Sequence, residues 1–273
     1  MIVYEERPRA PWRLWVFTAV LVSLTVGVIL GQTVTFEPTY RSTANAQTVA
    51  VPPAAVPPAP APAAVEQPWP DAEHRVTAPL GATRTRLLEV VGASASLHVR
   101  SANLGDALLD IATTDRGSVP RLTDTGRGSR LELVPTGNAG TVGAVIQLNA
   151  KVAWTLRLTG GAFKQDIDMR AGGVAGIAIA GGTAHVVLQL PAPKGTVPLS
   201  LTGPVGELAI RTKAGAPVRL RLGAGAGTAV VDGRTHRKVR AGTALTSAKW
   251  RSARNRYDIA LSDTVTSVRT AAS

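Results

Sequence analysis

The stretch 172-GGVAGIAIAGGTAHVVLQLP-191 contains two glycine pairs and two short runs in which aliphatic residues alternate with small or polar ones. Alternation with a period of two residues is typical of a β-strand that buries one face. Glycine reaches positive φ without a steric penalty, so each glycine pair can turn the chain sharply. The stretch therefore predicts short strands joined by tight glycine corners.

A repeat of about 21 residues extends this pattern through the second half of the chain. The first column of alternating aliphatic pairs consists of Leu156/Leu158, Ile177/Ile179, Leu199/Leu201 and Leu220/Leu222. The second column consists of Ile146/Leu148, Ile167/Met169, Leu188/Leu190, Leu208/Ile210 and Ala229/Val231. A regular period of this length is typical of solenoids, in which stacked turns share one continuous core. We therefore expect an all-β, β-solenoid-like domain over residues 75–270, with each pair stacked on the next.

Further alternating segments lie on both sides of the repeat. Before it come 95-ASLHV-99, 107-ALLDIA-112 and 130-RLELV-134, and the chain closes with 257-YDIAL-261 and 264-TVTSV-268. Turn-forming Gly, Asp, Asn and Ser residues separate the earlier segments, so each of the five segments is predicted to be a strand. No amphipathic helix is expected in this region.

The N-terminal region has a different character. Residues 12–36 form an apolar run in which no charged residue follows Arg13 before Glu37. This length is sufficient for a transmembrane helix, and Trp12 and Trp15 stand where interfacial aromatic residues are common. Arginines precede the run, so the positive-inside rule predicts a cytoplasmic N-terminus (residues 1–11), a single span, and an extracytoplasmic remainder in a protein of the cell membrane.

Two further expectations concern this apolar run. Ala44-Asn45-Ala46 resembles a signal-peptidase site, so cleavage near Ala46 is the alternative to a retained anchor. Small residues also recur every four positions on one face of the predicted helix, and such stripes allow close helix packing. The candidate face for dimerisation or for a membrane-helix partner is Ala19, Ser23, Gly27 and Gly31.

A linker rich in Pro and Ala is predicted over residues 37–74. Its central part, residues 50–70, carries eight prolines, which prevent both helix and sheet ladders. Such a segment favours polyproline II and can hold a domain away from its anchor.

Composition excludes several classes of site. The chain of 273 residues has no cysteine, so disulfides and thiolate metal sites are excluded. Its four histidines (His74, His98, His185, His236) have no metal-ligand spacing, and we expect four solvent-facing imidazoles. No nucleophile elbow and no P-loop occur. We therefore expect a protein without cofactor and without catalytic residues.

One pair of carboxylates provides an enzymatic alternative. Asp166 and Asp168 flank Ile167, so both are predicted on the outer face of one strand, about 7 Å apart. Paired carboxylates at such separations hydrolyse glycosides, which makes a carbohydrate-active β-helix enzyme the alternative function. Against it, the predicted turns are too short to enclose a cleft. The next rungs are expected to place Val187 and Gln189, then Glu207 and Ala209, beside this pair.

The charge distribution provides the main candidate site. The formal net charge is +12, and eight basic residues occur between positions 234 and 256 without any acidic residue. They are Arg234, Arg237, Lys238, Arg240, Lys249, Arg251, Arg254 and Arg256. A basic extracytoplasmic surface attracts anionic lipids or phosphate-bearing cell-wall polymers. Nucleic acid is not expected as a partner, because the predicted compartment is outside the cell and few aromatics are interleaved.

The β-region resembles the "putative adhesin" or toast-rack group of bacterial envelope β-domains. The residues that carry the resemblance are 90-VVGASASLHVRSANLGDALLDIATT-114, 163-FKQDIDMRAGGVAGIAIAGGTAHVVLQLP-191 and the closing RYDIALSDTVTSV of residues 256–268. The resemblance covers roughly residues 76–270 and implies a membrane-tethered domain associated with cell-surface structure or envelope stress. It supplies no active-site residues. A structural or interaction module is thus the expected function, with a regulator of membrane signalling as a further alternative.

Overall fold

The computed structural model describes residues 72–272, which fall within one compact unit of the chain, Ala64–Ser273. These residues form 19 strands and two short 3₁₀ helices, Ala72–His74 and Lys213–Gly215. The all-β prediction is therefore confirmed. Within residues 72–272 no helix has the length and hydropathy to cross a membrane. The predicted span at 12–36, the small-residue face from Ala19 to Gly31 and the proline-rich part of the linker lie outside the described residues.

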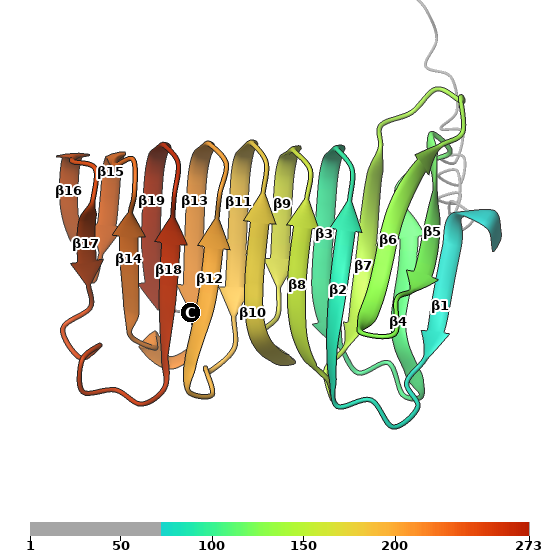
Figure 1. The fold of residues 1–273 in the computed structure, drawn as a ribbon, viewed down its shortest axis with the longest axis horizontal. Helices are drawn as coiled ribbons and strands as arrows, with labels where there is room; N and C mark the ends of the chain where they lie inside the picture. The colour runs from blue at the N-terminus through green and yellow to red at the C-terminus, as the bar shows by residue number, and fades with distance from the viewer. Residues whose placement is uncertain (1–71, 273) are drawn as a thin grey trace, which may run out of the picture. The chain divides into compact units, whose positions relative to one another are not determined.

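The strands form two mixed sheets that face each other (Figure 1). Sheet A has ten strands in the order β1 (Arg75–Pro79), β4 (Ala107–Thr113), β7 (Gly143–Asn149), β3 (Ser94–Ala102), β9 (Ala162–Asp168), β11 (Thr183–Leu190), β13 (Val205–Thr212), β19 (Val265–Ala272), β15 (Ala226–Val231) and β16 (Arg234–Val239). Sheet B has nine strands in the order β17 (Thr243–Thr246), β14 (Val218–Leu222), β18 (Arg256–Leu261), β12 (Thr196–Leu201), β10 (Gly173–Ala180), β8 (Ala153–Thr159), β2 (Thr85–Val91), β6 (Gly128–Pro135) and β5 (Ser118–Asp124).

The inner strands are paired in parallel, and the chain alternates between the two sheets. In sheet B, Leu156 pairs with Ile177 and Ile177 with Leu199, which confirms the first column across these three strands. The outermost pairs, such as β14 with β17 and β15 with β16, are antiparallel. The mixed sheets thus consist of a parallel centre closed by antiparallel strands at both ends.

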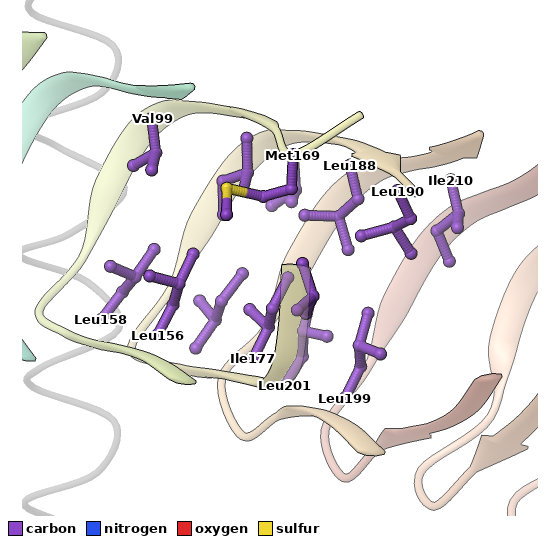
Figure 2. Close-up of a cluster of buried hydrophobic side chains, with 14 of the residues drawn as sticks. Val99, Leu156, Leu158, Met169, Ile177, Leu188, Leu190, Leu199, Leu201 and Ile210 are labelled. Atoms are coloured by element: carbon purple, nitrogen blue, oxygen red, sulfur yellow. The ribbon is translucent and has the colours of Figure 1, made fainter. Parts of the chain in front are cut away.

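The aliphatic side chains of the two sheets meet in one core. Leu156, Ile177, Leu199 and Leu220 are each at most 2% exposed. Figure 2 shows the inward side chains of one sheet, including Leu188 and Ile210, pointing toward those of the other, including Leu156 and Leu199. The described residues thus form a continuous core of their own, which is what an independently folding domain requires.

The last rung departs from the predicted order. Leu199 and Leu220 are not strand neighbours, because β18 lies between β12 and β14. Ile259 pairs with Leu199 on one side and with Leu220 on the other. In sheet A, β19 likewise separates β13 from β15. The direct stacking predicted for the fourth pair is therefore wrong, and the C-terminal strands fill that place.

The second column departs from the prediction in two places. Ile146 and Ile167 are not strand neighbours, because β3 lies between β7 and β9 and Val99 pairs with both. The sequence places Leu188/Leu190 beside Leu208/Ile210, but the structure pairs Leu188 with Ile210 and Val186 with Leu208. The same two-residue shift places Ala209 and Arg211, instead of Glu207 and Ala209, in line with Val187 and Gln189. A two-residue slip keeps every side chain on its own face, so alternation alone cannot detect it.

The glycine corners are packed against each other from rung to rung. Gly181 has φ +111°, and a Cβ at this position would lie 2.8 Å from the carbonyl carbon of Gly160. A Cβ at Gly203 would in turn lie 2.3 Å from the carbonyl oxygen of Gly181. Glycine is therefore required here both for backbone conformation and for the close approach of successive turns.

Candidate functional site: the basic C-terminal end of the domain

The predicted basic residues gather at one end of the two sheets. Arg234, Arg237 and Lys238 belong to β16, the edge strand of sheet A, and Arg240 follows it directly. Lys249, Arg251 and Arg254 lie in the loop of residues 247–255, which joins β17 at the edge of sheet B to β18 (Figure 1). We call these seven residues the C-terminal basic face.

A short turn and a pair of hydrogen bonds to Asp232 position the two halves of this face. Asp232 and Gly233, with φ of +50° and +75°, form the tight hairpin turn between β15 and β16. Such Asp-Gly turns match the twist of antiparallel strands. The Asp232 carboxylate also accepts hydrogen bonds from the Ser247 hydroxyl at 3.0 Å and from the Ala248 amide at 3.2 Å. Arg234 and Lys249 each lie two residues beyond this junction.

The loop of residues 247–255 has its own internal support. The Trp250 ring is 8% exposed, and its indole nitrogen donates to the Tyr257 carbonyl at 3.1 Å. The Ala253 amide donates to the Lys249 carbonyl at 3.1 Å. The Gly195 amide donates to the Asn255 side chain at 2.8 Å. The basic side chains of the loop are therefore presented from a fixed backbone.

Arg256, the eighth predicted residue, is a structural residue. Its guanidinium lies 4.0 Å from the centroid of the Trp250 ring, donates to the Trp250 carbonyl at 3.0 Å, and contacts the Thr196 hydroxyl at 3.0 Å. Cation–π contacts of this kind stabilise a partly buried loop. Arg256 consequently has little capacity left for a ligand.

Sequence reasoning missed the ion cluster behind this loop. Asp258, with 13% of its side chain exposed, accepts two hydrogen bonds from Arg219 and one at 3.2 Å from Arg221. The hydrogen bonds from Arg219 hold the pKa of Asp258 below its usual value. The Arg219 guanidinium also lies 4.0 Å from the Trp250 ring centroid. The alternating RLRL and YDIAL segments carry these residues, but only the observed pairing of β14 with β18 brings them together.

The C-terminal basic face, in contrast, has no internal neutralisation. All seven side chains are exposed. Within residues 72–272, no carboxylate lies within 4.0 Å of any of their charged groups. Lys and Arg on an edge strand also discourage edge-to-edge pairing of sheets. The basic residues of β16 have this structural role whether or not they bind a ligand. The unpaired charge leaves the face free to attract anions.

Asp166 and Asp168 both lie on the outer face of sheet A, as predicted. Asp168 accepts bidentate hydrogen bonds at 2.9 and 2.6 Å from Arg170, and these lower its pKa. Asp166 has an oxygen 3.9 Å from Nδ1 of His98. The Asp168 carboxylate is thus paired with Arg170, and neither carboxylate lines the hollow described below.

The histidines do not behave as one class. His98 and His185 are partly exposed on sheet A, but His74 is only 7% exposed, so the expectation of four solvent-facing imidazoles is wrong. Nδ1 of His74 lies 3.0 Å from both the Thr113 hydroxyl and the Ser118 carbonyl. Within the described part of the chain, no group of three His, Cys, Asp or Glu residues is placed to hold a metal ion.

The fold has a known counterpart. No family model matches the chain, and no curated protein sequence does either. A crystal structure described as a "putative cell adhesion protein" from Clostridium sporogenes ATCC 15579 is similar, with a TM-score of 0.50 and 16% sequence identity. The likeness covers 72% of this chain and 99% of that one. It shows a shared fold. At this identity it agrees with the adhesin-like β-fold expected from the sequence and carries no functional residue across.

Proposed function

We propose that this chain is an interaction module of the bacterial cell envelope, which binds phosphate-rich anionic surfaces through its C-terminal basic face. The observation that carries the proposal is the group of seven exposed, unpaired basic side chains at one end of the domain. Between residues 218 and 256 the sequence has ten basic residues and one acidic residue, Asp232. Such a field attracts polyanions over a Debye length and concentrates them at this end.

The proposed cellular arrangement follows from the N-terminal sequence. Residues 12–36 anchor the chain in the cell membrane, and the proline-rich segment holds the β-domain on the extracytoplasmic side. The adhesin-like fold of the Clostridium protein supports an interaction role and not any particular ligand. An association with envelope stress rests on the family resemblance alone.

A non-catalytic role is part of the proposal. Asp168 is bound by Arg170, whose hydrogen bonds lower its pKa, and this disfavours the protonated form that a general acid must supply. This supports a binding module over the enzymatic alternative.

Binding of the unit of residues 64–273 to two phosphate-rich probes tests the proposal. The probes are soluble poly(glycerol phosphate) and phosphatidylglycerol vesicles, which distinguish a wall polymer from a lipid surface. We expect binding to weaken as salt rises, because each phosphate contact releases counterions. The triple variant Lys249→Gln, Arg251→Gln, Arg254→Gln should bind at least tenfold more weakly and show a shallower salt dependence.

A matched control separates the basic face from net charge. Arg84, Arg121 and Arg127 are exposed at the opposite end of the domain, and no carboxylate of residues 72–272 lies within 4.0 Å of their guanidinium groups. Their triple substitution by Gln removes the same charge and should leave most of the binding intact. Equal losses in the two triple variants, or binding that ignores salt, would reject the C-terminal basic face as the site.

A further inference from the structure

A second surface lies on the outer face of sheet A, where residues of β11, β13, β19 and β15 line a hollow of about 330 Å³. Its floor is one cross-strand row, in which Val187 pairs with Ala209, Ala209 with Arg269, and Arg269 with Val230. Three of these four side chains are short and apolar. Beside this floor, the neighbouring row carries the longer side chains of His185 and Glu207 on β11 and β13.

The neighbouring row forms a polar wall along the hollow. Its members pair in register across the same strands: His185 with Glu207, Glu207 with Ser267, and Ser267 with Thr228. Nδ1 of His185 lies 3.3 Å from Oε2 of Glu207, which fixes these two side chains against each other. The wall therefore offers one hydrogen-bonding side chain per strand, spaced by the strand separation of about 4.8 Å.

An aromatic ring stands at the β9 end of the hollow. Phe163 is 66% exposed and is the one exposed large hydrophobic side chain within residues 72–272. Its ring contacts the His185 ring edge-on, with centroids 5.5 Å apart. Leaving a phenyl ring in water has no stabilising effect on the fold, and an isolated aromatic beside a polar hollow is a platform on which an apolar ligand face can stack.

The other half of the hollow carries the positive charge of Arg269. Arg269 is exposed, and no carboxylate lies within 4.0 Å of its guanidinium among the described residues. Its paired neighbours Ala209 and Val230 carry no charge. Glu207, the acidic residue of the wall, is bound to His185 at the aromatic end. The hollow is thus polarised, with an aromatic ring at one end and a free guanidinium toward the other.

We propose that this hollow binds an acidic polysaccharide laid across the strands of sheet A. The apolar face of one sugar stacks on Phe163, hydroxyl groups bond to the wall, and a sugar carboxylate pairs with Arg269. The strand separation of about 4.8 Å is close to the advance of a glycan per sugar, so successive sugars meet successive strands. Guanidinium–carboxylate hydrogen bonds supply the preference for an acidic sugar.

Other occupants fit the hollow less well. A peptide that adds to a sheet bonds to an open edge, whereas the backbone groups beneath this hollow are already used in the ladders of β11, β13, β19 and β15. A lipid chain requires apolar walls, but this wall is His185, Glu207, Ser267 and Thr228. A sugar ring combines an apolar face with a rim of hydroxyl groups, which matches the Phe163 ring and the polar wall.

Calorimetry with hexagalacturonate tests the site, and the fully methyl-esterified hexamer, which differs only in its carboxylates, tests the charge preference. The unit of residues 64–273 should bind the acid form and bind the ester about tenfold more weakly. Phe163→Ala and Arg269→Gln should each weaken binding of the acid form about tenfold. Arg269→Gln should also remove the difference between acid and ester, which a purely structural role of Arg269 would not do.

Two controls distinguish this site from the C-terminal basic face. Arg211→Gln removes an exposed arginine two residues beyond Ala209 on the same face, outside the hollow, and should not change binding. The triple variant at Lys249, Arg251 and Arg254 should also bind the hexamer normally. The proposal is overturned if the hexamer does not bind, if Phe163→Ala and Arg269→Gln bind it normally, or if the loop triple variant loses it. These outcomes are independent of binding to poly(glycerol phosphate).

Discussion

Leu199 and Leu220 lie on opposite sides of one strand, although they hold equivalent positions in the 21-residue repeat. The strand between them is β18, and Ile259 pairs with both leucines. Ile259 is fully buried. The C-terminal strands β18 and β19 are therefore inserted inside the sheets, where they connect β14 and β15 to the rest of both sheets.

Substitution Ile259→Ala should accordingly destabilise the domain by about 2–5 kcal/mol, the usual range for a large aliphatic residue truncated in a close-packed core. Urea unfolding monitored by the fluorescence of the buried Trp154 and Trp250 measures the change. Leu245→Ala on β17 is the matched control, because Leu245 is only partly buried and packs at the edge of the same core. A loss at Ile259 no larger than that at Leu245 would contradict the closing role of β18.

Removal of residues 256–273 tests the same arrangement in a different way. Without β18 and β19, the strands β14–β17 have no parallel partner, so we expect residues 218–246 to lose protection against hydrogen exchange. The repeat does allow β12 to pair directly with β14, since Leu199 and Leu220 are in compatible register. A truncated domain in which residues 218–246 stay protected would show that this alternative pairing forms.

These relationships show what the sequence could and could not predict. The period of 21 or 22 residues correctly aligned Leu156, Ile177 and Leu199, because each aliphatic pair must face the shared core. It could not show that β18 enters beside β12, since YDIAL and RLRL alternate in the same way and either one satisfies the core. Pairing of strands distant in sequence is set by packing of the whole domain and not by local pattern.

The candidate site was predictable to a similar degree. The sequence alone predicted the basic residues, because a segment with many Lys and Arg and no acidic residue is recognisable without a structure. It could not separate Arg256 from the others, since that depends on the position of the Trp250 ring. The hollow on sheet A was also not predictable, because its rows depend on the register of β13 and β19, and the sequence reading placed β13 two residues away.

The cluster around Asp258 gives a second stability prediction. Asp258→Asn removes the charged acceptor of Arg219 and Arg221 and should cost about 1.5–3 kcal/mol at pH 7, the range for hydrogen bonds to charged groups. Asp124→Asn is the control, because Asp124 also binds an arginine but is 67% exposed, where solvent screening weakens an ion pair. Equal effects in the two variants would contradict the importance of the partly buried cluster.

The same carboxylate predicts how stability depends on pH. The hydrogen bonds from Arg219 lower the pKa of Asp258 in the folded state, so the folded protein binds fewer protons than the unfolded chain. The stabilisation is complete above the unfolded pKa of about 3.9 and is lost as the pH falls through the lower folded pKa. The difference in unfolding free energy between wild type and Asp258→Asn should therefore shrink below about pH 4. A difference that stays constant down to pH 2 would exclude this linkage.

The glycine corners allow backbone strain and close approach to be measured separately. Gly181→Ala forces a residue with a Cβ to adopt φ +111° and brings that Cβ within 2.8 Å of Gly160, so we expect a loss of more than about 2 kcal/mol. Gly195 also has positive φ, +75°, but no atom lies within 4 Å of its added Cβ. Gly195→Ala should thus cost only about 1 kcal/mol. If the two substitutions cost the same, the backbone at the stacked corners must shift easily to accommodate the added Cβ.

One inward position carries a polar side chain in the aliphatic core. Gln165 pairs with Leu97 on β3 and with Val186 on β11, is 1% exposed, and has no hydrogen-bond partner for Oε1. A buried polar atom without a partner is unfavourable, so Gln165→Leu should stabilise the domain by about 1 kcal/mol in urea unfolding. Gln189→Leu, on the outer face of β11, is the control and should give no gain. If Gln165→Leu instead destabilises the domain, the Gln165 amide must form a stabilising hydrogen bond in solution, and the prediction is wrong.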